Sequence, residues 1–112
     1  MTEIAFSIAR DFSRNPGPRL KSQGAASGEA LREAIKRNLQ NFAGRIVIDL
    51  DGTAGFGSSF LDEAFAGLVR KGVLSRADAH RRLAFKSQID PTYVTEIWEA
   101  IDDAPEPRSE TS

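Results

Sequence analysis

Residues 46–65, IVIDLDGTAGFGSSFLDEAF, decide the fold. The stretch opens with three β-branched apolar residues, which predict a strand buried on both faces at the centre of a helix-covered sheet. A loop with three glycines follows, and then a helix whose wide apolar face continues to about residue 70, where basic residues and Gly72 end it. A strand that passes through a loop into a helix is typical of α/β proteins.

On the N-terminal side of this stretch, Ile4, Phe6 and Ile8 alternate with smaller residues, which predicts a strand with one buried face that can continue to Phe12. A proline- and glycine-rich turn follows, and residues 19–22 could return as a short strand. Ser27 is placed to cap a helix that begins at residue 29. That helix has one apolar stripe, formed by Leu31, Ala34, Ile35 and Leu39.

On the C-terminal side, Ser75 can cap a short helix that ends near residue 81, and Leu83 and Phe85 indicate a further strand. Pro91 can occupy the first turn of a last helix, with an apolar stripe of Val94, Ile97, Trp98 and Ile101. Alternating strands and helices predict a single α/β domain over residues 1–103. We expect a mixed, mostly parallel sheet of about four strands with three to four helices, and a disordered tail over residues 104–112.

Composition excludes several classes of protein. The 112 residues include no cysteine and one histidine, so disulfide frameworks, thiolate metal sites and multi-histidine sites are ruled out. We expect no membrane span, because no apolar run approaches the roughly 18 residues that one needs. The N-terminus does not resemble a signal peptide, which favours the cytoplasm. The glycine-rich loop lacks a Walker lysine and a complete dinucleotide fingerprint, so we expect no cofactor.

The net charge of −1 hides an asymmetry. Residues 1–86 hold 14 of the 15 basic residues and carry a net charge of +5, whereas residues 87–112 carry −6. A solvated acidic segment that keeps the protein soluble accounts for this. Opposite patches that meet in a homodimer, or on a protein partner, are the alternative interpretation.

Two carboxylates stand at the end of the central strand. Asp49-Leu50-Asp51-Gly52-Thr53 resembles the first motif of haloacid-dehalogenase-type phosphotransferases, DxDGT. The resemblance implies that Asp49 is the phosphoryl-accepting nucleophile and Asp51 the acid/base, both beside Mg²⁺. Residues two apart point to the same face of a strand, as that chemistry requires. Only one strand follows, however, too few for that family's sheet. A Mg²⁺-dependent phosphohydrolase is therefore the alternative function.

A longer resemblance covers most of the chain. Ser27-Gly28-Glu29, then VIDLDGTAGFGSSFLDEAFAGLVR and then EIWEAI resemble the STAS-like proteins, a small bacterial family of unassigned activity. These are related in fold to the anti-sigma-factor antagonist domains, in which a partner kinase phosphorylates a serine at a helix start. The resemblance implies a STAS-like α/β fold and a non-enzymatic regulatory module that binds a protein partner, such as a histidine-kinase-like ATPase.

The antagonist pattern, Asp-Ser-Ser-Gly-Leu, can be placed on residues 57–61. Ser58 and Ser59 then take the serine positions, while Gly57 replaces the Asp and Phe60 replaces the Gly. The resemblance implies Ser58 as the phosphorylation site, with Ser59 second. It also implies an interaction loop formed by Gly52, Gly55, Phe56, Gly57 and Asp62.

The same serines have a purely structural interpretation. Either Ser58 or Ser59 can cap the helix, and capping by Ser59 would put Asp62 at the third helical position, a variant of the capping box. A phosphate at a helix N-terminus is also favourable, because it meets free N–H groups and the positive end of the dipole. Both interpretations remain open from the sequence.

A basic stretch raises a third class of function, nucleic-acid binding. It comprises Arg70, Lys71, Arg76, Arg81, Arg82 and Lys86. In nucleic-acid-binding proteins, several aromatic residues usually alternate with basic residues of this kind. Here Phe85 is the one aromatic residue within the basic stretch. We therefore expect a solvated surface. His80 has no paired nucleophile and is expected at a helix end, whereas Trp98 is expected in the core.

Overall fold

The sheet consists of three parallel strands, β1 (Glu3–Ser7), β2 (Arg45–Asp49) and β3 (Leu83–Lys86), in the order β1-β2-β3. The structure is a computed structural model and describes residues 2–107. In the register, Ile46 of β2 lies between Ile4 of β1 and Leu83 of β3. These side chains all face the helices, and Ile46 is fully buried. The central strand therefore holds the core, as its sequence predicts.

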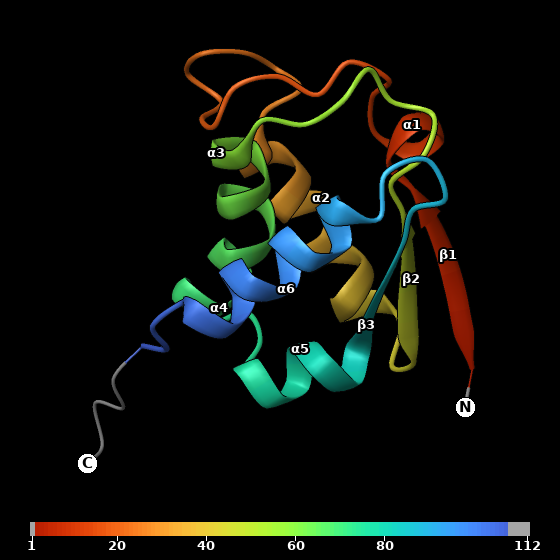
Figure 1. Cartoon of the computed structure of the whole chain (residues 1–112). Coiled ribbons are helices and arrows are strands. Elements are labelled where there is room, and N and C mark those ends of the chain that lie inside the picture. Colours follow the sequence, from red (N-terminus) through yellow and green to blue (C-terminus); the bar gives the residue numbers. More distant parts are fainter. Residues whose placement is uncertain (1, 108–112) are drawn as a thin grey trace.

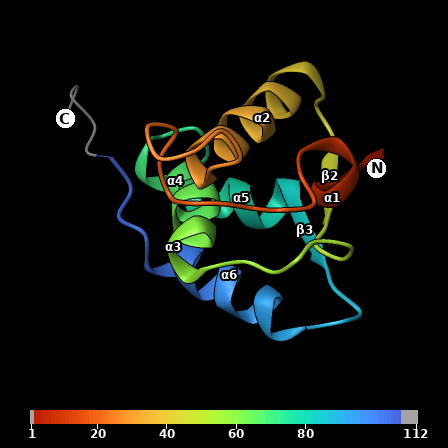
Figure 2. The same cartoon turned by 90° about the horizontal axis from the view of Figure 1, so that it is seen from above.

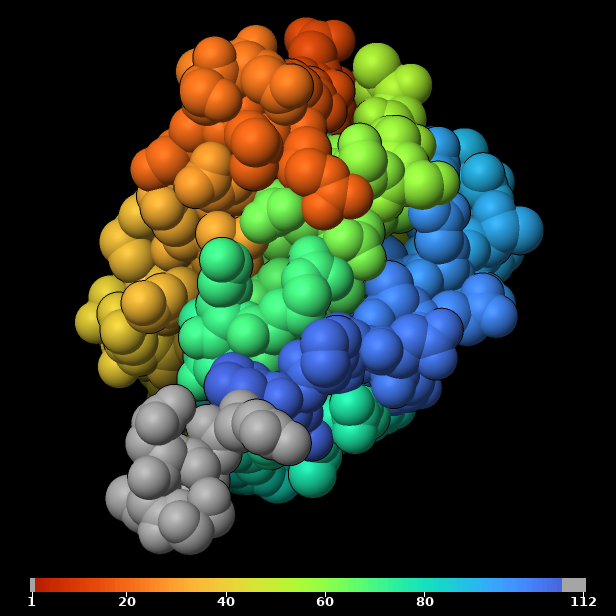
Figure 3. All heavy atoms as spheres, turned by 90° about the vertical axis from the view of Figure 1, so that its left-hand side faces the viewer, coloured from red at the N-terminus to blue at the C-terminus, as the bar shows by residue number. Residues whose placement is uncertain are grey.

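The helices lie on one side of this sheet (Figures 1 and 2). They are α2 (Gly28–Asn41), a continuous helix formed by α3 (Ser58–Leu61), η1 (Asp62–Ala66) and α4 (Gly67–Arg70), then α5 (Arg76–Arg82) and α6 (Thr92–Asp103). Because each strand pairs with the next along the chain, both right-handed crossovers pass on the same face. Figure 3 shows the outer side of this helical layer.

The core fills the space between the sheet and these helices. Its largest fully buried side chains are Phe60, Phe65, Ile8, Leu31, Ile35, Ile46, Ile48, Leu61, Leu68, Leu83, Ile97 and Ile101. The predicted stripes of α2 and α6 supply four of these, Leu31, Ile35, Ile97 and Ile101. Ser27 and Ser75 cap α2 and α5 as predicted, since each hydroxyl accepts a hydrogen bond from the amide three residues later. The α/β class and its main helices are confirmed.

The prediction of about four strands was wrong. Residues 19–22 form a bend and a turn instead, in which Gln23 N–H donates to the carbonyl of Leu20 and Gly24 N–H to that of Lys21. Within the described residues the sheet has three strands, and all are parallel.

The first strand also ends earlier than its alternation predicts, and a short helix, α1 (Ile8–Asp11), follows it. The Ser7 hydroxyl accepts a hydrogen bond from Arg10 N–H at 3.1 Å, and the Asp11 carboxylate accepts one from Ser7 N–H at 2.9 Å. This reciprocal pair resembles a capping box and favours the turn over further strand. With residues 58–70 counted as one helix, residues 2–107 form five helices, not three to four.

The prediction that β2 is buried on both faces is confirmed for the face toward the helices and wrong for the opposite face. Ile46 and Ile48 are fully buried under the helices, but Val47 on the opposite face is only partly buried. No described helix packs on that second face (Figure 2), because both crossovers pass on the first.

The structure describes the first part of the segment expected to be a disordered tail, residues 104–107 of 104–112, and this part contacts the domain. Ala104 is buried, and its carbonyl accepts a hydrogen bond from Arg76 at 2.6 Å. Arg76 also pairs with Glu106 at 3.4 Å. Residues 108–112 lie outside the described residues.

Arg82, the last residue of α5, binds the end of α2. Its guanidinium donates to the carbonyls of Leu39, Phe42 and Gly44, the last at 2.8 Å. The last carbonyls of a helix have no partner within the helix, so one planar cation satisfies several acceptors here.

Replacing Arg82 with Lys tests this contact. A single ammonium cannot reach three carbonyls in fork geometry, so we expect the free energy of unfolding to fall by about 1–3 kcal/mol. Urea unfolding followed by circular dichroism measures the change. The matched control is Arg81→Lys, at an exposed side chain paired with Asp78, where we expect less than about 0.5 kcal/mol. Equal effects of the two substitutions would contradict a stabilising role of Arg82.

Candidate functional site

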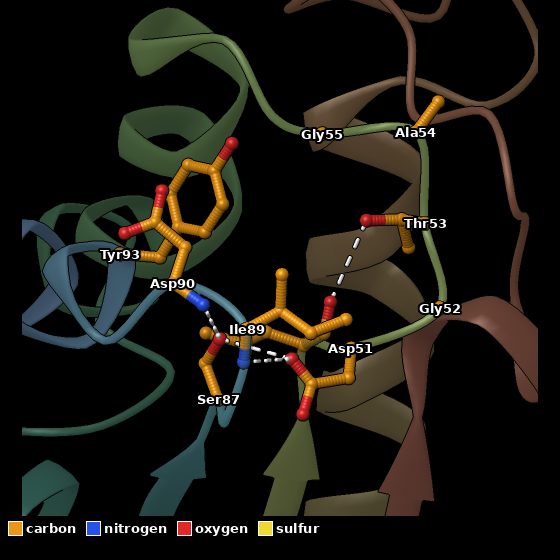
Figure 4. A pocket seen from close by; sticks show the side chains of 10 residues that line it. Asp51, Gly52, Thr53, Ala54, Gly55, Ser87, Ile89, Asp90 and Tyr93 are labelled. Carbon is orange, nitrogen blue, oxygen red and sulfur yellow. Dashed lines mark hydrogen bonds between the residues drawn. The ribbon is translucent and has the colours of Figure 1, made fainter.

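The loop after β2 lies at the carboxyl edge of the sheet, where ligand sites of α/β proteins usually gather. Together with the loop after β3, it encloses a shallow hollow of about 170 Å³ (Figure 4). This is smaller than the roughly 300 Å³ at which small-molecule pockets begin. The hollow is lined by Leu50, Asp51, Gly52, Thr53, Ala54, Gly55, Ser87, Ile89, Asp90 and Tyr93.

Asp51 joins these two loops. One carboxylate oxygen accepts hydrogen bonds from the Ser87 hydroxyl at 3.0 Å and from Ile89 N–H at 3.2 Å, and the other accepts one from Gln88 N–H at 2.8 Å. The hydrogen bond from Gln88 N–H contributes most to holding the pKa of Asp51 below its ordinary value. The side chain therefore has the environment of a structural anion that organises a loop.

Asp49 has separate partners. One of its oxygens accepts a hydrogen bond from Asp51 N–H at 3.0 Å, and the other lies 3.9 Å from the Lys86 ammonium. The two acids of the DxDGT motif therefore bind different local groups. In the part of the chain that the structure describes, no three acidic or histidine side chains are grouped so that they could hold a metal ion.

Two of the loop glycines have positive φ angles, +92° at Gly52 and +124° at Gly55. A side chain is strained in this region, so these positions favour glycine for the path of the chain. At Gly55 a Cβ atom would also lie 3.3 Å from the Tyr93 hydroxyl, which accepts a hydrogen bond from Phe56 N–H at 3.4 Å. No local pattern in the sequence indicates that Tyr93 supports this loop, because the two are 37 residues apart.

Phe56 packs inward from this loop. Its ring meets Tyr93 edge-on at 5.1 Å between centroids and lies 5.8 Å from Phe60, which is fully buried. The side chain assigned to the interaction loop is thus an anchor for it. Phe60 occupies the position where antagonists have glycine, and here it belongs to the core.

The serines lie at the exposed start of α3. Gly57 is the N-cap residue, and among the described residues no side chain caps the helix. The prediction that Ser58 or Ser59 is the N-cap was therefore wrong. The chain is still extended at Gly57, with φ −80° and ψ 152°, so Ser58 is already the first helical residue. Gly57, Ser58 and Ser59 are all exposed.

The helix that follows widens into a π-helical segment at η1. A π-helix hydrogen-bonds five residues apart, and such segments inside α-helices are frequent at functional sites. Asp62 and Glu63 begin this segment, and both bind arginines.

Three arginines surround this acidic pair. Arg32 of α2 forms an ion pair with Glu63, and its guanidinium also donates to the Glu63 carbonyl at 3.0 Å. Arg19, from the loop before α2, reaches Glu63 at 3.0 Å and Asp62 at 3.1 Å, and Arg70 reaches Asp62 at 2.9 Å. We call these five residues the arginine–carboxylate network. Asp62, assigned to the interaction loop from the sequence, is instead bound within it.

Glu63 is the least exposed acid of the network, with 12% of its side chain accessible, and Arg32 has 11%. Burial raises the pKa of Glu63, but hydrogen bonds from Arg32 and Arg19 outweigh it and hold that pKa below its ordinary value. The pKa of Asp62 is lowered in the same way, against burial, by Arg70 and Arg19. A carboxylate whose pKa falls on folding stabilises the folded state when it is ionised.

Most of the basic stretch has partners within the protein. Arg70 binds Asp62, Arg76 binds the carbonyl of Ala104, and Arg82 binds the end of α2. His80 is exposed at the end of α5, as expected, and lies 2.6 Å from Asp102. Its ring stacks on Trp98 at 4.3 Å, so the tryptophan packs at the edge of the core rather than within it.

The network predicts a specific loss of stability at low pH. The free energy of unfolding should fall as the pH approaches the ordinary pKa values of the two acids, 4.5 for Glu63 and 3.8 for Asp62, and continue to fall below them. Glu63→Gln removes part of this dependence. At neutral pH it leaves Arg32 without its buried partner, which costs about 3 kcal/mol. Urea titrations at a series of pH values measure both effects.

Glu33→Gln is the matched control, because Glu33 forms an ion pair with Lys21 at 2.8 Å in which both side chains are more than 40% exposed. We expect it to change the stability by less than about 1 kcal/mol. A pH dependence that is as steep in Glu63→Gln as in the wild type would show that the network does not couple folding to pH.

Comparison with known proteins bears on the whole of this region. Neither a curated protein nor a solved structure matches the chain. The family model described as a STAS-like domain of unknown function matches residues 27–91, more than half of the chain. The match runs from the cap of α2 to the residue before α6 and includes β2, the glycine-rich loop, the exposed serines and β3. This confirms the resemblance on residues 27–29 and 47–70, and the chain belongs to the family of STAS-like domains of unknown function.

Proposed function

We propose that this chain is a non-enzymatic regulatory module of the bacterial cytoplasm that binds a protein partner at the loop and helix start of residues 52–62. Phosphorylation of Ser58 switches the binding, with Ser59 as the second candidate. A histidine-kinase-like ATPase is the proposed partner. The observation that carries the proposal is the exposed N-terminus of the helix over residues 58–70, where Ser58 is the first helical residue and Gly57 supplies no capping side chain.

Local geometry supports a switch at Ser58. The first amides of a helix have no partner within it, so a phosphate placed there meets N–H donors and the positive end of the dipole. The helix behind it is held by the buried Phe60 and by the arginine–carboxylate network. A phosphate would therefore change the charge and shape of the surface while the helix stays folded.

Gly57 supports a docking role for the same surface. A Cβ atom built there meets no described atom within 4 Å, and φ is −80°, so a larger residue fits without strain. The position is open toward solvent, next to the two serines. A bulky residue there would block a partner without disturbing the fold.

The environment of the DxDGT acids supports a non-enzymatic role. Both oxygens of Asp51 accept hydrogen bonds from the loop after β3, so this carboxylate already has a structural role. Asp49 is held by the loop amide of Asp51 and lies beside Lys86.

Substitutions at the exposed helix start test the docking proposal. Ser58→Asp and Gly57→Trp should each abolish capture of the partner from a lysate of the native organism, because each alters only the docking surface. We expect Ser58→Asp to leave thermal stability unchanged or to raise it by up to about 1 kcal/mol, since an acid is favourable at a helix N-terminus.

The matched controls are Ser22→Asp and Ala25→Trp, which place the same side chains at exposed positions in the loop before α2. Both should retain the partner. Peptide mass mapping of the protein from its native cells should find phosphate on Ser58. Unchanged capture by both helix-start variants, with no phosphate found, would refute the switch.

An assay with p-nitrophenyl phosphate tests the non-enzymatic proposal. With Mg²⁺ present, we expect the wild type to hydrolyse this ester no faster than Asp49→Asn does, because the two acids of the DxDGT motif hold the loops in place. Mg²⁺-dependent hydrolysis that Asp49→Asn abolishes would establish the phosphohydrolase alternative instead.

A further inference from the structure

The face of the sheet opposite the helices has an apolar centre. Val47 lies in the middle of β2, and the register places Ala5 and Ala84 on either side of it. Ala5 is exposed, while Val47 and Ala84 are partly exposed. Parallel sheets are almost always covered on both faces, and a β-branched residue at the centre of the middle strand suits such a cover. In residues 2–107 no helix packs on this face (Figure 2).

Charged residues flank this apolar row on β2. Arg45 lies two residues before Val47 and Asp49 two residues after it, so all three side chains share the face. On the neighbouring strand β1, the register places Glu3 beside Arg45 and Ser7 beside Asp49. Each of these two strands thus has a long charged side chain at one end of the face and a shorter polar one at the other.

We propose that a second copy of this chain covers this face, with the two sheets stacked face to face and their strands antiparallel about a two-fold axis at Val47. Such an axis places Val47 opposite its own copy and Arg45 opposite Asp49 of the second copy, twice per dimer. It also places Glu3 opposite Ser7 of the second copy. Long side chains meet short ones at the roughly 10 Å spacing of stacked sheets. The charges of Arg45 and Asp49 are therefore self-complementary, and Lys86 shares the face beside Asp49.

The contacts that Arg45 and Asp49 make within the chain are compatible with this dimer. Arg45 has no ion-pair partner among the described residues, and its Nε atom is buried without a hydrogen bond there. Among the described residues Asp49 forms one ion pair, with Lys86 at a loose 3.9 Å, and Arg10 also lies within electrostatic range of it. Both groups can therefore take a partner from outside the chain. This inference is independent of the proposed switch, which lies at the start of α3.

The area of this sheet face determines how tightly the two copies are expected to bind each other. Three short strands expose roughly 240 Å² of sheet per copy, whereas a stable interface buries about 800 Å² per partner. The dimer should therefore belong to the weak class and form only at high concentration. Sedimentation velocity from about 10 μM to about 1 mM covers the range where such association is visible.

Charge reversal gives the sharpest test. Arg45→Asp places acid opposite acid, and Asp49→Arg places base opposite base, so each alone should weaken self-association about tenfold or more. Mixing the two variants restores both opposite-charge contacts and should restore a heterodimer. Val47→Lys, which leaves Asp49 and its loop contact in place, should also abolish association. Circular dichroism checks that each variant is folded.

The matched control is Arg81→Asp, which changes the charge by the same amount on the exposed surface of α5 and should leave association unchanged. A wild-type chain that stays monomeric up to about 1 mM overturns the proposal and leaves the face to a partner of different sequence. Association that survives Arg45→Asp and Val47→Lys also overturns it, because the dimer would then use another surface.

Discussion

The rest of the structure depends on one topological constraint: the three strands are parallel and follow one another across the sheet in chain order. Parallel neighbours need a crossover, and right-handed crossovers that advance in one direction all pass on the same face. The helices are therefore gathered on one side, where Ile46 and Ile48 of β2 are buried. The same constraint brings the loops after β2 and β3 to one edge of the sheet, where Asp51 can bridge them.

Charge plays two different roles in this domain. Within the helical layer, the arginine–carboxylate network links the loop before α2, α2 itself and the helix over residues 58–70 through Asp62 and Glu63. At such partly buried sites each carboxylate is favourable only while its arginines are in place, so the network favours one arrangement of these segments over others. At the helix start beside it, Ser58 and Ser59 are exposed and free of such contacts among the described residues. The network therefore holds the helix in place behind its exposed N-terminus.

The sequence predicted those features of the fold that depend on residues close together in the chain. The periodicity of α2 and α6, the caps Ser27 and Ser75 and the apolar strand β2 each depend on neighbours within a few residues, and the structure contains all of them. The serine cap of α3 failed because the extended backbone at Gly57 starts the helix one residue earlier than a serine cap allows. The partners of Asp51 and Glu63 could not be predicted, since they lie more than 30 residues away in the chain. The motif Asp-x-Asp-Gly-Thr identifies the acids but not the groups that bind them.

The parallel register also affects how this domain folds. Residue 3 pairs with residue 45, and residue 46 with residue 83, so neither strand pair can form through a tight hairpin. The chain must close two long loops before the sheet contributes any stability, which slows folding relative to helical bundles of the same length. The helices α2 and α6, with their strong apolar stripes, are the elements most able to form early. Before β1 pairs with it, β2 has an unpaired edge, and such edges are the parts of a sheet at which chains aggregate.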